Sequence, residues 1–325
     1  MFRYALKRLV MLIPVILGVT ILIFTLMYLV PGDPAVSILG STAEPWEYEQ
    51  LREAMGFNKP YIVRLFNYIV QVYGHFDLGS SYLTGVPIMT ELMSGRLVRT
   101  LILGFVSVFV SFGIGIPLGI NAAVHKDTLG DWLPLTIALL GVSMPGFWFA
   151  LMLVVIFSIK LGWLPAYGMG GIEYWILPIL SGSLHGIANL SRQTRASMLE
   201  VLGSDYIVMA RSKGMPEKDV IFKHALPNAL IPIITIMGGT LAHIFGGGML
   251  TETIFSIPGV GYYMVKAVNQ RDYPAVQGSV LLLSIVFSVV MLLTDLVMAA
   301  VDPRIKAQFA SRVKSRKPKE EAANG

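Results

Sequence analysis

Residues 204–227 read SDYIVMARSKGMPEKDVIFKHALP, and this stretch predicts two short helices between apolar segments. Ser204 or Asp205 can accept a hydrogen bond from the free N–H groups of the first helix, and Gly214 suits the left-handed residue that ends it. The second helix begins at Pro216 and stops before the Leu-Pro pair. We therefore expect a rigid, mostly polar pair of helices held by the apolar segments on either side.

The composition places the chain in a membrane. Of its 325 residues, 54% are hydrophobic and 14% are charged, whereas soluble domains average about 25% charged residues. The absence of cysteine excludes disulfides and thiol chemistry. The net charge of +5 does not indicate nucleic-acid binding, because the basic residues lie between apolar runs and at the chain ends rather than along one face with aromatic residues.

Six apolar runs predict an all-α polytopic membrane protein, since about 20 apolar residues cross a bilayer. The expected spans cover residues 9–30, 101–124, 133–159, 176–190, 229–250 and 277–301. The first run is too long for a signal peptide and is expected to be retained. We expect a break in the third span at 143–146, a break in the fifth at 246–248, and a tight re-entrant turn at 258–261.

The runs divide the chain into four parts. Residues 1–30 form a cytosolic N-terminus and the first span, and 31–99 form an external loop with surface helices over 45–55 and 60–73. Residues 100–301 hold the other five spans, and 302–325 form a basic tail.

Charge sets the orientation of these parts. Most of the 25 Lys and Arg residues fall on the side that holds both termini and residues 204–227. The positive-inside rule therefore predicts a cytoplasmic location for both ends and for that stretch.

No catalytic pattern appears in the sequence. A P-loop, a His-Glu-x-x-His pair and a Gly-x-Ser-x-Gly elbow are all missing, so ATP must be bound by another chain or energy must come from an ion gradient. We expect no metal site. Asp295 lies in the last span, where we favour a paired or neutral carboxyl near the cytosolic end over a proton relay. The lone histidines His185 and His243 are interpreted as hydrogen-bonded packing residues.

Residues 204–227 resemble the conserved cytoplasmic loop of ABC importer permeases, whose pattern is Glu-Ala-Ala, three residues, Gly, nine residues, then Ile-x-Leu-Pro. The positions that keep the pattern are Ala210, Gly214, Leu226 and Pro227. The positions that depart from it are Val208, Met209 and His224. Two segments, Ala-Arg-Ser-Lys-Gly at 210–214 and His-Ala-Leu-Pro-Asn at 224–228, are similar instead to sequences of the peptide-transport branch of that family.

Motifs elsewhere extend the resemblance over essentially the whole chain. They are PGDP at 31–34, FDLGSS at 76–81, ETIFSIPGVG at 252–261, RDYP at 271–274 and DPR at 302–304. Together they resemble the B-type permease subunit of dipeptide, oligopeptide and nickel importers. An external loop directly after the first span, without a long N-terminal extension, favours the B-type over its C-type partner.

The resemblance implies a type I ABC importer permease fold with six spans in the inner membrane, surrounded by lipid. It also implies a C-type permease partner, two ATPase subunits that bind ATP and Mg²⁺, and an extracytoplasmic substrate-binding protein. The chain itself would bind no cofactor and would not be an enzyme. In this family the loop is the coupling helix that contacts the ATPase.

Candidate residues follow from the loop and from the predicted breaks. Helical periodicity puts Tyr206, Met209 and Ala210 on one face, and Tyr206 and Met209 are expected to be its apolar plugs. The candidate coupling residues are Asp205, Tyr206, Met209, Ala210, Arg211, Lys213, Gly214, His224, Leu226 and Pro227. The candidate gate and pathway residues are Ser143, Asn189, Gln193, Met249, Glu252, Pro258 and Gly259.

Other functions stay open at this point. The same family includes relatives that carry nickel or oligosaccharides, so the solute is not fixed by the permease sequence. An ion-coupled secondary transporter or channel would show an internal repeat and paired intramembrane charges, and neither is clear. An intramembrane enzyme lacks a recognisable nucleophile or metal set.

Overall fold

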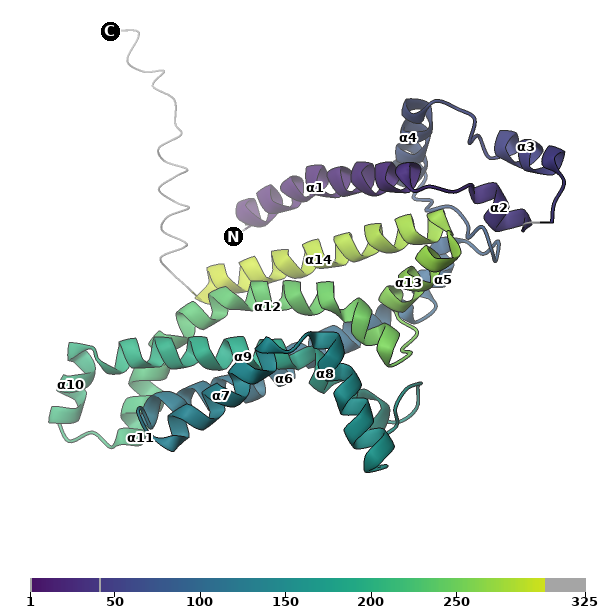
Figure 1. Ribbon diagram of the computed structural model, residues 1–325. Helices are drawn as coiled ribbons and strands as arrows, with labels where there is room; N and C mark the ends of the chain where they lie inside the picture. Colours follow the sequence, from purple (N-terminus) through teal and green to yellow (C-terminus); the bar gives the residue numbers. More distant parts are fainter. Residues whose placement is uncertain (1, 41, 302–325) are drawn as a thin grey trace, which may run out of the picture.

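The computed structural model describes residues 2–40 and 42–301, and this part of the chain is built from helices and short connections. The predicted basic tail, residues 302–325, lies outside the described residues. Five long helices run side by side (Figure 1). They are α1 (Phe2–Leu29), α6 (Arg96–Val124), α9 (Glu173–Leu202), α12 (Leu226–Ile254) and α14 (Tyr273–Val301). Contacts join them in the order α1, α14, α12, α9 and α6.

Three of these helices are long and apolar enough to cross a membrane: α1 from Arg8, α6, and α14 as far as Val297. A fourth crossing follows if the bent pair of α7 (Leu129–Ser143) and α8 (Gly146–Leu153), extended by the π-helical segment η2 (Val154–Lys160), counts as one. Helix α9 is longer than predicted and carries many serines. The count of six spans therefore stays a prediction, while the all-α membrane architecture is confirmed.

The predicted break in the third span is confirmed at Met144. That residue is extended, as the residue before a proline tends to be, and Pro145 is the N-cap residue of α8. The axes of α7 and α8 differ by 107°. Figure 1 shows α8 turning away from the neighbouring long helices.

Two other predicted breaks are wrong. The backbone of α12 is helical through Gly246–Gly248 and on to Ile254, because each glycine keeps its backbone N–H and C=O and can continue the helical hydrogen bonds. The second short helix also does not stop before Pro227: a π-helical segment, η3 (Val220–Ala225), leads directly into α12. Proline fits there because it occupies the first turn after the widened segment, where its missing N–H is tolerated.

One end of the bundle carries the small helices that precede α6 or follow α12 (Figure 1). They are α2 (Pro34–Leu39), α3 (Pro45–Ala54), α4 (Tyr61–Ile69), the π-helical η1 (Val70–Gly74), α5 (Ile88–Met93) and α13 (Val260–Gln270). The predicted surface helices coincide with α3 and with α4 plus η1. The Tyr61 hydroxyl lies 2.7 Å from Thr25 Oγ1 and the Tyr73 hydroxyl lies 2.6 Å from Thr20 Oγ1, so α4 and η1 are fastened along α1.

The opposite end carries α10 (Asp205–Ser212) and α11 (Glu217–Asp219), together with the start of α1 (Figure 1). Nearby, Asp295 of α14 forms an ion pair of 3.0 Å with Arg8 of α1. The intramembrane carboxyl is therefore paired, as predicted.

Small residues let α6 and α9 approach closely. A Cβ at Gly119 would lie 2.5 Å from the Ser191 carbonyl oxygen, and one at Gly115 would lie 2.9 Å from the Ile187 carbonyl oxygen. The Gly115 and Gly119 spacing thus marks a helix contact, as small residues do in membrane proteins.

Candidate functional site

Helix α10 is the first part of the site, and local sequence signals set its ends. Ser204 occupies the N-cap position, although its hydroxyl donates back to the Val201 carbonyl (2.6 Å) and caps no N–H group of α10. The predicted capping hydrogen bond is therefore wrong, while the predicted start of the helix is right. Gly214 follows the helix at φ +74°, which confirms its left-handed role.

Apolar side chains point outward from α10. Tyr206 is 45% exposed, Val208 54% and Met209 61%. We call these three residues the exposed face of α10. Large apolar side chains exposed on a mostly polar loop indicate a contact site for another protein.

The other side of α10 is buried. Ile207 is fully buried and Ala210 is 9% exposed, and both join a cluster with Met198 of α9 and Val220 of η3. Ala210 therefore does not share a face with Tyr206 and Met209 as predicted. This cluster fastens α10 to α9 and to the start of α12, so a force on α10 reaches both long helices.

Some polar residues of the loop are hydrogen-bonded to one another. The Arg211 guanidinium donates to both Glu217 carboxylate oxygens, at 2.6 and 3.1 Å, across the Gly214 turn. This hydrogen bonding holds the pKa of the Glu217 carboxyl below its usual range. Asp205 and Lys213 are exposed. The remaining candidates, His224, Leu226 and Pro227, lie in continuous helix at the base of the loop.

The second part of the site lies at the other end, where Glu252 is 1% exposed. Its carboxylate accepts hydrogen bonds from Thr100 Oγ1 (2.6 Å) and from the Tyr262 N–H (2.9 Å). Thr100 Oγ1 in turn accepts from the Val260 N–H (2.9 Å). One buried carboxylate thus joins α6, α12 and α13.

Glycines make room for this carboxylate. A Cβ at Gly259 would lie 2.4 Å from Glu252 Cδ, and one at Gly261 would lie 2.7 Å from Met249 Cα. The neighbouring Pro258 carbonyl accepts a hydrogen bond from Arg99 (3.2 Å). The chain turns between α12 and α13 over residues 255–259, and Val260 and Gly261 already belong to α13. Side chains of α6 and α12 close this turn, while its re-entrant character stays a prediction.

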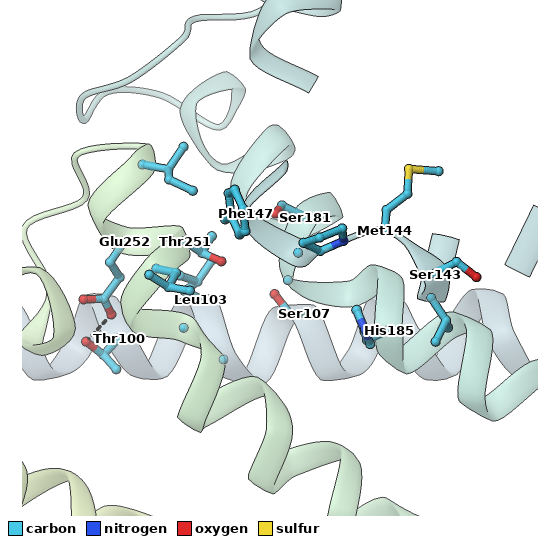
Figure 2. Close-up of a pocket in the computed structure, with 18 residues that line it drawn as sticks. Thr100, Leu103, Ser107, Ser143, Met144, Phe147, Ser181, His185, Thr251 and Glu252 are labelled. Carbon is cyan, nitrogen blue, oxygen red and sulfur yellow. Dashed lines mark hydrogen bonds between the residues drawn. The ribbon is translucent and has the colours of Figure 1, made fainter. Parts of the chain in front are cut away.

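A pocket of about 430 Å³ lies beside Glu252, between α6, α9, α12 and the break of α7 and α8. Figure 2 shows hydroxyl, imidazole and apolar side chains around it. Its labelled polar residues are Thr100, Ser107, Ser143, Ser181, His185, Thr251 and Glu252. The Ser107 hydroxyl is buried and has no hydrogen-bond partner among the described residues. The pocket therefore offers both apolar surface and an unused polar group.

The structure brings together only some of the predicted pathway residues. Ser143 and Glu252 line the pocket, Gly259 packs against Glu252, and the Pro258 carbonyl is hydrogen-bonded to Arg99. Met249 packs against Gly261, and neither Asn189 nor Gln193 lines the pocket. The Asn189 side chain instead accepts a hydrogen bond of 2.7 Å from Arg192.

Sequence reasoning missed several residues at both ends. Thr100 and Ser107 lie about two helical turns apart within ordinary apolar sequence, and only the fold shows that they face Glu252 and the pocket. It also missed a buried ion pair, in which Arg195 of α9 donates to Asp131 of α7 at 2.5 and 2.6 Å. The sequence signal that could have found this pair is Asp131, an aspartate two residues before the predicted third span.

Sequence comparison assigns both halves of the chain to one kind of protein. The family described as binding-protein-dependent transport system inner membrane component matches residues 115–307, and its N-terminal companion family matches residues 1–104. The dipeptide transport system permease protein DppB of Alkalihalophilus pseudofirmus is 40% identical, covering 94% of this chain and 100% of that protein. The glutathione transport system permease protein GsiC of Salmonella typhimurium is 38% identical over 94% and 99%.

Solved structures share the fold. The inward-facing MetNI methionine ABC transporter matches with a TM-score of 0.57 and 19% identity, covering 66% of this chain and 98% of the matched chain. An amino acid ABC transporter matches with a TM-score of 0.50 and 15% identity over 66% and 95%. At this identity the likeness concerns the arrangement of helices alone.

Proposed function

Because the chain belongs to the family of binding-protein-dependent transport system inner membrane components, we propose that it is a permease subunit of an ATP-driven importer of di- and oligopeptides. The solute class rests on the relatives: one is named for dipeptide transport and another for glutathione transport. These names favour peptides over the nickel or oligosaccharide that the resemblance alone left open.

The observation that carries the coupling role is the exposed face of α10. Tyr206, Val208 and Met209 are open to contact while the other side of the helix is buried against α9 and η3. Arg211 and Glu217 brace the turn, so the surface is formed before a partner arrives. It fits a groove on an ATPase subunit, which would bind ATP and Mg²⁺ and perform the hydrolysis.

The remaining partners complete an importer. A C-type permease would form a heterodimer with this chain, a second ATPase subunit would serve that permease, and an extracytoplasmic protein would deliver peptide. The α10 end and both termini would face the cytoplasm of the inner-membrane assembly, since most basic residues lie on that side.

Transport would follow from the packing of α10. Closure of the ATPase subunits on ATP would displace α10, and the cluster around Ile207 would pass the movement to α9 and α12. Both helices line the pocket beside Glu252, which is of a size for a small peptide segment. Hydrolysis would then return the helices to their starting position.

Co-purification tests this proposal. A tagged copy of the chain is extracted in mild detergent from its own host, and the proteins that accompany it are identified. We expect a second permease and P-loop ATPases, and ATP-dependent peptide uptake when the complex is placed in vesicles with its binding protein. Recovery of this chain alone, moving solute without ATP, would contradict the proposal.

A further inference from the structure

A second cavity, of about 590 Å³, lies at the end of the bundle that carries α2 to α5, away from the pocket beside Glu252. Its walls come from the last turns of α1, from α3 and α4, from the loop at 78–82 and from the first turns of α14. Figure 1 shows these elements together at the ends of the α1 and α14 helices. The cavity therefore sits where two membrane-crossing helices leave the hydrocarbon.

The polar lining of this cavity carries positive charge. Arg64 and Lys59 line it, and no aspartate or glutamate does. Among the described residues no carboxylate lies within ion-pair distance of Arg64, whose guanidinium lies over the rings of Tyr28 (5.3 Å) and Phe57 (5.1 Å). An arginine held in place by aromatic rings is ready to receive an anion.

Two tyrosine hydroxyls in the same cavity have no hydrogen-bond partner among the described residues. Tyr273 is 8% exposed, and neither its hydroxyl nor that of Tyr68 has a hydrogen-bond partner among the described residues. Burial raises the pKa of the Tyr68 phenol, so this hydroxyl stays neutral and can donate. Buried hydroxyls of this kind normally find a partner, which here would come from outside the chain.

Part of the lining is apolar. Phe24 and Met27 of α1 form part of the wall, together with Met55 and Leu78. A lining that combines apolar side chains with cationic and phenolic donors suits a molecule with a charged head and an apolar body.

We propose that this cavity binds the phosphate of an anionic phospholipid, with Arg64, Tyr68 and Tyr273 as donors and Phe24 and Met27 against the glycerol and upper acyl chain. The site is separate from the coupling and pathway regions. Its occupancy would fasten the small outer helices to α1 and α14.

Lipid titration tests the site. The purified full-length chain in detergent micelles is titrated with dioleoyl phosphatidylglycerol or dioleoyl phosphatidylcholine, and bound lipid is counted by native mass spectrometry. We expect a preference for phosphatidylglycerol that falls about tenfold in Arg64→Gln, since a charge-assisted hydrogen bond is lost. Lys266→Gln, which removes an exposed cation of α13 outside the cavity, should change it less than about twofold.

The phenol variants guard against an effect of misfolding. Tyr68→Phe and Tyr273→Phe remove only hydroxyls that have no partner in the protein, so the chain should fold as before and yet bind phosphatidylglycerol about threefold to tenfold more weakly. Equal binding of the two lipids, or unchanged binding in the phenol variants, would overturn the proposal. Displacement of the lipid by glycerol phosphate alone at equal concentration would also overturn it. The same holds if Arg64→Gln binds phosphatidylglycerol normally but no longer associates with the extracytoplasmic binding protein.

Discussion

Three apolar side chains of α10 stand open at one end of the bundle, whereas at the other end the Glu252 carboxylate is 1% exposed and held by Thr100 and Tyr262. The first region is a surface that the chain folds by itself but leaves uncovered. The second is a junction in which three helices depend on one side chain.

The contrast separates two kinds of task. A surface awaiting a partner needs exposed apolar groups on a rigid support, and changing those groups alters association while leaving the fold intact. A buried hydrogen-bonded junction fixes the relative positions of helices, and changing it alters stability first. Variants at the two ends should therefore differ in what they damage.

The largest loss of stability is expected for Glu252→Ala. The change leaves Thr100 Oγ1 and the Tyr262 N–H without their acceptor, and each such buried donor costs about 1–3 kcal/mol, so the free energy of unfolding should fall by at least about 2 kcal/mol. The loss of stability is measured as a lower midpoint of thermal unfolding in detergent. Glu252→Gln keeps an acceptor oxygen and should lose less. An unchanged midpoint in Glu252→Ala would mean that the junction does not hold the outer end together.

Gly261→Ala should have the next largest effect. The added methyl would lie 2.7 Å from Met249 Cα, and because that atom belongs to the backbone the helices must shift, at a cost of about 1–3 kcal/mol. Gly113→Ala is the matched control, since no atom lies within 4 Å of its Cβ position, and it should stabilise α6 by about 0.5–1 kcal/mol. Equal unfolding temperatures for the two variants would contradict the packing at the turn.

At the α10 end, Tyr206→Ser should leave stability within about 0.5 kcal/mol of the native value and weaken association with the ATPase subunit about tenfold. Ile207→Ser, one position along the chain but fully buried, should instead lower the unfolding temperature sharply. Binding is measured by titrating the purified ATPase onto the permease in nanodiscs. If Tyr206→Ser binds the ATPase subunit as tightly as the native chain, the exposed face of α10 is not part of the coupling interface.

The smallest effect concerns the Arg211 and Glu217 pair. The pKa of the Glu217 carboxyl is lowered in the folded protein by hydrogen bonds from Arg211, so its contribution to stability is present above the unfolded pKa of about 4.5 and is lost as pH falls through the folded pKa. The pair is exposed, and it should contribute less than about 1 kcal/mol at pH 7. NMR titration of Glu217 should give a pKa below 4.5 that rises toward it in Arg211→Gln. Identical titrations would contradict the pairing.

The two ends also differ in how well sequence predicts them. The start of α10, its end at Gly214 and the outward Tyr206 and Met209 follow from local signals, because capping, glycine dihedrals and helical period act over a few residues. The partners of Glu252 lie about 150 residues away on α6 or beyond a turn, and no local pattern records them. The predicted breaks at Gly246–Gly248 and Pro227 were wrong for different reasons. The glycines keep the N–H groups that continue a helix, and Pro227 follows a π-helical segment that leads directly into α12.

The central claim, that residues 204–227 couple this permease to ATP hydrolysis, is tested most directly at Gly214. Its φ of +74° is closed to proline, whose φ lies near −65°, and proline also lacks the N–H that donates to the Arg211 carbonyl (2.9 Å). Peptide-stimulated ATPase activity of the reconstituted complex is compared for Gly214→Pro and Gly214→Asn, since asparagine tolerates left-handed dihedrals. We predict that the proline variant inserts into the membrane but loses stimulation, while the asparagine variant keeps most of it. Normal stimulation in Gly214→Pro would contradict the account.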